Sequence, residues 1–277
     1  MAEVDLHLHT TRSDGTLTPT QLIDLVASKG LKIIAVTDHD STAGLDEAYA
    51  AAKRHPQLTI IPGVEISTDI EGGEIHILAY YVDKHDAEFQ RNLERFRAAR
   101  YERGRLMVLK LRKLGMDLSW ERVLQIAGDA SVGRPHVARA MVEAGFVKST
   151  QEAFDNYLGR NGPAYVEREK LTPEEAIALA RANGAVPVLA HPSYVKDIET
   201  MLPRLAKEGL GGIEVYYGSY GEDTVAYFLR LSQTHKLVPC GGSDYHANGH
   251  AEEVQPGTVG PPRETVERLH ALSGTRR

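Results

Sequence analysis

The chain begins with an apolar run that carries two histidines, Asp5-Leu6-His7-Leu8-His9. The residues from Glu3 to Leu8 predict a β-strand, and alternate residues on a strand point to the same side. Both imidazoles can therefore reach one metal ion. The pair alone is weak evidence, because histidines at this spacing are structural or incidental about half of the time.

The same combination of an apolar run and metal-ligand side chains recurs along the chain. The later examples are Thr37-Asp38-His39-Asp40, Pro62-Gly63-Val64-Glu65, His76 in the run from Glu74 to Tyr81, Ala190-His191-Pro192 and Gly242-Ser243-Asp244-Tyr245-His246. In a parallel barrel the carboxyl ends of all strands open on one face, where active sites lie. We therefore expect these side chains to converge on one pocket.

Seven apolar runs predict strands, and helical patterns separate most of them. The runs are Glu3 to Leu8, Lys32 to Val36, Leu58 to Glu65, Glu74 to Tyr81, Val186 to Ala190, Gly212 to Tyr216 and Leu237 to Gly241. Two helices have clear start signals, Thr18-Pro19-Thr20-Gln21 and Thr172-Pro173-Glu174-Glu175, each with a capping threonine followed by proline. The alternation predicts βα units and a parallel sheet covered on its outer face.

The middle of the chain has a different pattern, without a convincing strand from about residue 85 to residue 164. Asp86 to Leu114 reads as one long, arginine-rich helix, and shorter helices follow around Ser119 to Ala127, Pro135 to Glu143 and Thr150 to Leu158. We interpret residues 85–164 as an all-helical insertion, or cap, in an α/β barrel formed by residues 1–84 and 165–277.

Composition and net charge limit the partners of the chain. The chain has 277 residues and a net charge of −6, so its overall charge does not attract polyanions, and it has no long basic run that could bind nucleic acid. If the protein binds a phosphate, the positive charge for it must be local, which favours bound metals. The start of the chain does not resemble a signal peptide, no run is long enough to span a membrane, and the single cysteine, Cys240, suits a reducing cytosol. We expect a cytoplasmic protein, and nothing implies a stable protein partner.

A charge count supports several metal ions. Asp14, Glu65 and Asp244 supply three negative charges, and burying such groups without compensation costs several kcal/mol for each ion. Three divalent ions would leave the site with a net charge of about +3 before a hydroxide or substrate entered. An acidic protein could hold a phosphate in this way.

In order and spacing, these motifs resemble the PHP (polymerase and histidinol phosphatase) superfamily, especially its small stand-alone phosphoesterases. The matching segments are Asp5-Leu6-His7-Leu8-His9, Ser13-Asp14-Gly15, Thr37-Asp38-His39, Pro62-Gly63-Val64-Glu65, His76, Ala190-His191-Pro192 and Gly242-Ser243-Asp244-Tyr245-His246. The resemblance implies a distorted (β/α)7 barrel with a centre of three divalent metals.

The resemblance also implies how nine side chains share these metals. One ion would be held by His7, His9, Glu65 and Asp244; a second by Glu65, His76 and His191; and a third by Asp14, His39 and His246. Some family members have histidine where this chain has Asp14, a difference that could shift the preferred metal. Mixed imidazole and carboxylate ligands suit manganese, iron or zinc, and we expect Mn²⁺ first, with Fe²⁺ or Zn²⁺ as alternatives.

Four further residues are candidates outside the metal ligands. Arg134 and His136 lie in Gly133-Arg134-Pro135-His136, where the arginine could bind phosphate at a helix N-terminus, and related nucleotide-cleaving PHP enzymes carry a similar Arg-x-His. We expect Arg134 and His136 to contribute to substrate binding and catalysis, and Arg160 to contact a second phosphate, although a solvated loop arginine is the simpler interpretation of Arg160. Asp38 precedes the predicted ligand His39 and is expected to assist catalysis by orienting imidazole rings.

The resemblance implies hydrolysis of phosphate esters by metal-activated hydroxide. The expected substrates are 5′-nucleotides, 3′,5′-bisphosphorylated nucleosides or the 5′ end of a short RNA. Histidinol phosphate is an alternative substrate, and a non-catalytic PHP module is an alternative of another class. The complete set of ligands and the absence of room for a polymerase body argue against the latter.

Overall fold

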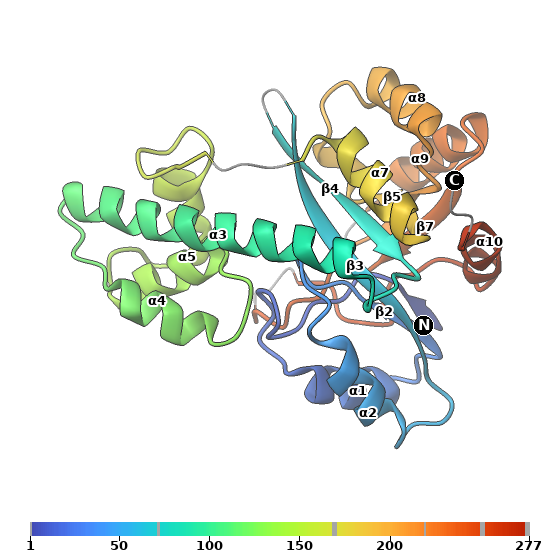
Figure 1. The fold of residues 1–277 in the computed structure, drawn as a ribbon, viewed down its shortest axis with the longest axis horizontal. Coiled ribbons are helices and arrows are strands. Elements are labelled where there is room, and N and C mark those ends of the chain that lie inside the picture. Colours follow the sequence, from blue (N-terminus) through green and yellow to red (C-terminus); the bar gives the residue numbers. More distant parts are fainter. Residues whose placement is uncertain (1, 71–72, 168–170, 219, 250–252, 275–277) are drawn as a thin grey trace.

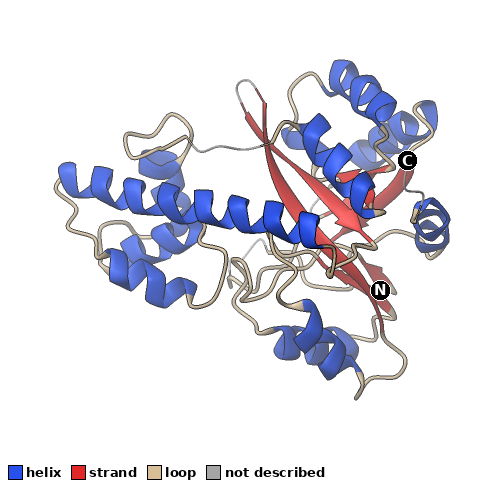
Figure 2. Cartoon of the chain, in the orientation of Figure 1, coloured by secondary structure: helices blue, strands red, loops and turns tan. Residues whose placement is uncertain are grey.

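The structure is a computed structural model that describes residues 2–70, 73–167, 171–218, 220–249 and 253–274. Seven strands follow one another in sequence order around one sheet (Figures 1 and 2). They are β1 (Val4–Asp5), β2 (Ile33–Val36), β3 (Thr59–Ile70), β4 (Gly73–Tyr80), β5 (Val186–Leu189), β6 (Gly212–Tyr217) and β7 (Val238–Gly242).

The described residues also form ten α-helices. They are α1 (Pro19–Ser28), α2 (Leu45–Ala52), α3 (Ala87–Lys113), α4 (Trp120–Ala127), α5 (Arg134–Glu143), α6 (Thr150–Ala153), α7 (Pro173–Asn183), α8 (Ile198–Glu208), α9 (Glu222–Thr234) and α10 (Glu264–Leu272). A π-helical turn, η1 (Phe154–Leu158), follows α6, and a 3-10 turn, η2 (Pro192–Tyr194), follows β5. None of the helices in the described part of the chain has the length and apolar character that crossing a membrane requires.

The first and last strands meet and nearly close the sheet into a barrel. The Leu6 N–H donates to the Gly241 carbonyl at 3.1 Å, and Leu8 forms a parallel bridge with Tyr245 just beyond β7. Gly242 permits this approach, because a Cβ atom there would lie 2.6 Å from an Asp5 carboxylate oxygen and 2.7 Å from the His7 Cβ. The prediction of a distorted α/β barrel with seven strands is confirmed.

Strand β4 departs from the expected parallel sheet. It pairs antiparallel with both β3 and β5, whereas the other neighbouring pairs are parallel, as is the bridge between Leu8 and Tyr245. The expectation that the ligands lie at the carboxyl ends of strands is therefore wrong for His76, which lies in the first half of β4. It is also wrong for Glu65, which lies in the middle of β3 because that strand continues to Ile70. Because β4 runs in the opposite direction, its beginning lies at the edge of the barrel where the other strands end.

Two predicted helix starts are present as capping boxes. The Thr18 hydroxyl accepts a hydrogen bond from the Gln21 N–H at the start of α1, and Thr172 and Glu175 form the same arrangement at α7. Proline occupies the first turn of both helices, where its missing N–H costs no hydrogen bond. These signals fix where each helix begins and therefore how its apolar face meets the sheet.

The long helix α3 takes part in two apolar clusters. Near its start, Phe89, Leu93 and Phe96 pack with residues of the barrel. Farther along, Met107 and Leu111 pack with a separate cluster in the cap of residues 85–164, and partly buried side chains as far as Val166 pack against this cluster. Figure 1 shows α3 running from the barrel to the helices of the cap, so one continuous element joins the two clusters.

Candidate metal centre

Nine side chains predicted as metal ligands come together at one edge of the barrel. They are supplied by six of the seven strands or by the loops that follow them: His7, His9, Asp14, His39, Glu65, His76, His191, Asp244 and His246. Most are buried, although histidine and carboxylate side chains normally favour water. The barrel thus gathers residues from both ends of the chain into one polar cluster.

Glu65 lies at the centre of this cluster, and each of its carboxylate oxygens faces imidazole nitrogens. One oxygen, Oε2, lies 3.1 Å from His7 Nε2, 3.1 Å from His9 Nε2 and 3.3 Å from His39 Nδ1. The other, Oε1, lies 2.7 Å from His76 Nδ1 and 3.1 Å from His191 Nε2. Each oxygen therefore lies among imidazole nitrogens that could bind a cation together with it.

Three sets of ligand atoms are compact enough for a metal ion, with all atoms of a set within 4.8 Å of one another. The first set has the four residues predicted for one ion: His7, His9, Glu65 and Asp244. The second set adds His9 to the predicted trio of Asp14, His39 and His246.

The third set, His39, Glu65 and His76, differs more from the prediction, since His39 takes the place expected for His191. His191 nevertheless faces the same Glu65 oxygen as His76 does.

Unpartnered polar atoms show that the cluster fits bound cations. Among the described residues, His9 Nε2, Asp14 Oδ1, His39 Nδ1 and Asp244 Oδ1 are buried and lack a hydrogen bond of acceptable geometry. His9 Nε2 and Asp244 Oδ1 even approach each other to 3.1 Å. Buried polar atoms normally have partners, so atoms that converge without hydrogen bonds are the arrangement expected around metal ions.

The ionisation of the cluster reflects its density of charge. Burial opposes protonation of His7, but Asp244, Glu214 and Glu65 raise the pKa of this imidazole well above its usual value. Burial also opposes protonation of His9, but the neighbouring carboxylates of Asp244 and Glu65 raise the pKa of this imidazole to about 10. Burial lowers the pKa of His39 to about 3. Protons on some imidazoles thus balance the carboxylates in the way that bound cations would.

Two residues that the sequence motifs did not indicate hold the ligands in place. Glu214, buried on β6, lies with one oxygen 3.0 Å from His7 Nδ1, and its other oxygen accepts the His191 N–H at 2.7 Å. The Tyr217 hydroxyl donates to Asp244 Oδ2 at 2.8 Å. The available signal was a glutamate inside the apolar run Gly212–Tyr217, because a charge in a buried strand requires a partner.

Asp38 supports the loop between His9 and Asp14. Its carboxylate accepts the Thr10 N–H at 2.8 Å, the Thr10 hydroxyl at 2.7 Å and the Ser13 hydroxyl at 2.7 Å. The Ser13 hydroxyl in turn lies 3.4 Å from His9 Nδ1. The contact of Asp38 with an imidazole is therefore indirect, through Ser13, and its part in catalysis stays a prediction.

Arg134 lies where the cap meets the metal ligands. It lines a cavity of about 100 Å³ together with side chains of the barrel and the cap: Asp14, His39, Glu74, His76, Arg100, Arg103, Pro135 and Phe154. Its guanidinium donates to Glu74 Oε2 at 2.6 Å and lies 5.6 Å from the centre of the Phe154 ring. Glu74 Oε1 lies 3.7 Å from His76 Nε2, so Glu74 connects Arg134 to the histidine cluster.

His136 and Arg160 have other partners. The buried His136 ring accepts the Gly133 N–H on Nδ1 at 2.8 Å, and burial lowers its pKa to about 4. Arg160 donates to Asp69 at 3.1 Å and to the Gly73 carbonyl at 2.6 Å, which ties the cap to the β3–β4 hairpin. The substrate contacts expected of both residues stay predictions.

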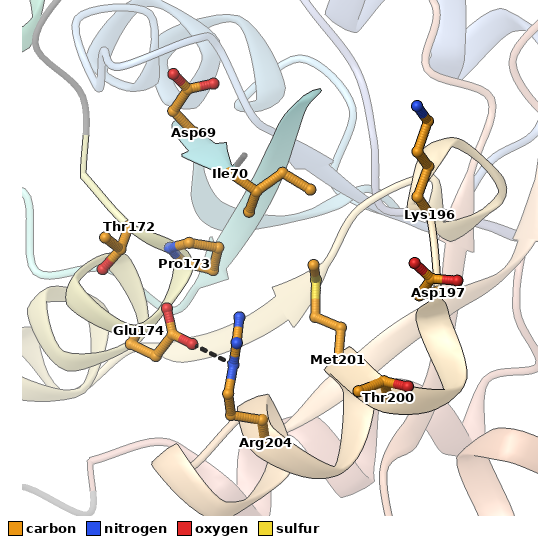
Figure 3. Close-up of a pocket in the computed structure, with 10 residues that line it drawn as sticks. All are labelled: Asp69, Ile70, Thr172, Pro173, Glu174, Lys196, Asp197, Thr200, Met201 and Arg204. Carbon is orange, nitrogen blue, oxygen red and sulfur yellow. Dashed lines mark ion pairs between the residues drawn. The ribbon is translucent and has the colours of Figure 1, made fainter. Parts of the chain in front are cut away.

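A larger cavity, of about 540 Å³, lies where the β3–β4 hairpin meets the starts of α7 and α8 (Figure 3). An ion pair of 2.7 Å between Arg204 and Glu174 lies at one side of it. None of the nine predicted ligands lines this cavity. The chemistry of the lining residues, and not the volume, identifies the histidine cluster as the candidate site.

Comparisons with known proteins agree with this geometry. Residues 5–160 match the family model described as the PHP domain. A 3′,5′-nucleoside bisphosphate phosphatase from Chromobacterium violaceum is 34% identical over 268 residues, which cover 92% of this chain and 94% of the relative. The 5′-3′ exoribonuclease Rnm from Salmonella typhimurium is 34% identical, with 87% and 84% covered.

A solved structure from Bifidobacterium adolescentis, described as a candidate metal-dependent phosphoesterase, superposes with a TM-score of 0.88 at 30% identity. The alignment covers 98% of this chain and 96% of that one. The family model spans more than half of the sequence and these relatives align with most of it, so the chain belongs to the PHP domain family.

Proposed function

We propose that this protein hydrolyses phosphate esters of nucleotides with the help of divalent metal ions, of which Mn²⁺ is our first choice. The substrates would be 5′-nucleotides, 3′,5′-bisphosphorylated nucleosides or the 5′ end of a short RNA. The observation that carries the proposal is the convergence of the ligand cluster with Arg134 at one small cavity.

Local charge at this cavity supports binding of a phosphate. The protein as a whole has a net charge of −6, yet three arginines, Arg100, Arg103 and Arg134, line the cavity. Arginine is suited to phosphate because its planar guanidinium can donate two parallel hydrogen bonds. Arg100 and Arg103 are buried, with 5% and 3% of their surface exposed, whereas 21% of the Arg134 side chain is exposed. Arg134 is therefore the most accessible of the three donors for a substrate.

The residues that would hold the metals are the nine of the cluster, with Glu65 shared between neighbouring ions. Divalent ions bound there would lower the pKa of water and stabilise negative charge on the phosphoryl oxygens. Glu214 and Tyr217 would fix the orientation of His7 and Asp244, since ligands are kept in place by their outer hydrogen bonds. The number of ions, three, is part of the proposal.

Arg134 would position the phosphate in this arrangement. Its salt bridge with Glu74 and its contact with the Phe154 ring hold the guanidinium at the wall of the cavity before substrate arrives. A group that is already oriented loses little entropy on binding, and donors directed at a phosphoryl group stabilise its charge as the reaction proceeds. Arg134 thus belongs to the binding machinery, and its removal should reduce the stabilisation of the transition state.

The names of the relatives support a nucleotide substrate. One is a phosphatase of 3′,5′-nucleoside bisphosphates and another is a 5′-3′ exoribonuclease, and both act on phosphate groups attached to nucleosides. A cavity of about 100 Å³ is below the ~300 Å³ at which ligand pockets usually begin, so it suits a phosphoryl group with the rest of the substrate outside it.

A phosphate-release screen in the presence of Mn²⁺ tests the proposal. It should include nucleoside 5′-monophosphates, 3′,5′-bisphosphates, short 5′-phosphorylated RNAs and histidinol phosphate. We expect release from the nucleotides and loss of turnover, with the fold retained, in His7→Ala and Asp244→Ala. Release from histidinol phosphate alone would contradict the substrate class. Tight metal binding without release from any ester would indicate a non-catalytic module.

Arginine variants of the cap test the role of Arg134. Arg134→Gln should lower kcat/KM for nucleotides by about 10- to 100-fold, because a hydrogen bond to a charged group contributes about 1.5 to 3 kcal/mol. Arg122→Gln is a matched control, since Arg122 also pairs with a glutamate, Glu143, but on the exposed surface of the cap. Equal effects of the two substitutions would argue against a substrate contact by Arg134.

A further inference from the structure

Tyr194 is an exposed aromatic residue beside the metal cluster. It ends the turn η2, three residues after the predicted ligand His191, and 67% of its surface is accessible to solvent. The centre of its ring lies 5.5 Å from that of His191, whose Nε2 faces Glu65 at 3.1 Å. The ring therefore stands next to the cluster while most of it stays open to a ligand.

The turn that carries Tyr194 is held by hydrogen bonds to the residues on either side of Pro192. The backbone N–H of His191 donates to buried Glu214 at 2.7 Å, and His191 itself has a φ of 30°, in the left-handed region. The Tyr220 hydroxyl donates to the Ser193 hydroxyl at 2.8 Å and accepts the Ser193 N–H at 3.0 Å. These bonds hold the position of Tyr194 before any ligand binds.

Among the described residues, Tyr194 is the one exposed large apolar side chain beside the cluster. The other exposed large apolar residues are Tyr101, Leu109, Leu114 and Leu272, which lie on or just after α3 and on α10. Tyr194 instead continues a row of rings: His191 lies 5.7 Å from Tyr217, which lies 5.1 Å from Tyr220. The ring at the exposed end of such a row offers a flat apolar face.

The cavity beside Arg134 is too small for a whole nucleotide, so the nucleoside needs a binding surface outside it. At about 100 Å³ it suits the phosphoryl group, so the nucleoside must extend away from the ligands across the rim of the barrel. A base stacks on an aromatic side chain through its π-face, which every base has, and this contact contributes about 1 to 3 kcal/mol per base. An exposed tyrosine at the rim can supply this contact.

We propose that Tyr194 forms a stacking surface for the nucleobase of the substrate while the phosphate lies among the metal ligands. This inference rests on the proposed function and adds a contact to the nucleoside. Because the contact is stacking and uses no base-edge hydrogen bond, the protein should accept purine and pyrimidine nucleotides alike.

A pair of substrates that differ only in the base tests the proposal. Adenosine 5′-monophosphate and ribose 5-phosphate carry the same phosphate ester, but only the first has a base. For each, kcat/KM is measured with Mn²⁺ for the wild type, Tyr194→Ala and Tyr194→Phe. Tyr101→Ala is the matched control, since its exposed ring packs on Trp120 in the cap.

We expect Tyr194→Ala to lower kcat/KM for adenosine 5′-monophosphate by about 5- to 100-fold, mainly through KM, and to leave ribose 5-phosphate within about twofold. Tyr194→Phe and Tyr101→Ala should keep the wild-type values for both substrates. An equal loss on both would mean that Tyr194 acts through His191 and would overturn the proposal, as would no loss on either.

Equilibrium dialysis separates this inference from the proposed function. If the wild type releases phosphate from neither compound and from none of the nucleotides in the screen, the proposed function fails, but binding of the two compounds to the Mn²⁺-loaded protein still tests the stacking. The wild type should then bind adenosine 5′-monophosphate more tightly than ribose 5-phosphate, and Tyr194→Ala should abolish the difference. A wild type without this preference, or a variant that keeps it, would overturn the inference.

Discussion

Replacing Glu214 by glutamine should weaken metal binding while leaving the shape of the side chain intact. In the structure, one carboxylate oxygen faces His7 Nδ1 at 3.0 Å and the other accepts the His191 N–H at 2.7 Å. When His7 binds a metal through Nε2, its Nδ1 carries a proton, so both partners of Glu214 are donors. A glutamine can accept only one of them, and its NH₂ group must face the other.

The size of the effect follows from this mismatch. Loss of an outer hydrogen bond to a ligand histidine typically lowers metal affinity about 10- to 100-fold, which corresponds to about 1.4 to 2.7 kcal/mol. A buried donor without an acceptor costs a similar amount, about 1 to 3 kcal/mol. Both effects act on the same few atoms, so we expect the combined loss of affinity to lie near the upper end of the first range.

Competition with a metal-binding dye measures this loss directly for Mn²⁺ and Zn²⁺. Glu175→Gln is the control, because Glu175 caps α7 through the Thr172 N–H at 2.8 Å and glutamine serves that role equally well. Circular dichroism of each variant shows whether the fold is retained. A folded Glu214→Gln protein with wild-type metal affinity would refute the role assigned to Glu214.

Three further predictions concern stability. Gly242→Ala should destabilise the barrel by about 3 kcal/mol, because the new Cβ would lie 2.7 Å from the His7 Cβ, and a wild-type midpoint in chemical denaturation would contradict this. Burial lowers the pKa of His136 from 6.5 to about 4, so the neutral ring stabilises the fold fully above pH 6.5 and this contribution is lost as pH falls toward 4. Between pH 7 and pH 5 the wild type should lose about 2 kcal/mol more than His136→Gln, and parallel pH profiles would show that the ring is not held neutral. Removing metal with a chelator should lower Tm by about 5 to 10 °C at a prior metal concentration near 100 Kd, and an unchanged Tm would count against a cation in the cluster.

Much of this architecture could be predicted because the ligands occupy recognisable places in the sequence. An apolar run such as Val186–Leu189 must be buried, and a histidine two residues after it, such as His191, must lie near the strand end. The same reasoning predicted the barrel, and together with the motifs it predicted the PHP family and a phosphoester hydrolase. The fold and the comparisons confirm these predictions.

The direction of β4 could not be predicted in this way. Its apolar run carries no information about direction, and the expectation of a parallel sheet came from the helices between the other strands. The role of Glu214 could not be predicted because its partners, His7 and the His191 backbone, are remote from it in sequence. The hydrogen bonds of Asp38 and His136 depend on which loop or helix end packs beside them, and such tertiary contacts leave no local pattern.

Closure of the barrel between β1 and β7 bears on how the protein acquires its metals. Asp5 and Ser243, hydrogen-bonded across this seam, are separated by 238 positions, so a growing polypeptide exposes the first ligands long before Asp244 and His246 leave the ribosome. Contacts between such distant residues form late and slowly. Translation thus delays full coordination of a metal ion until Asp244 and His246 have been made, and until then His7 and His9 form an incomplete set of ligands.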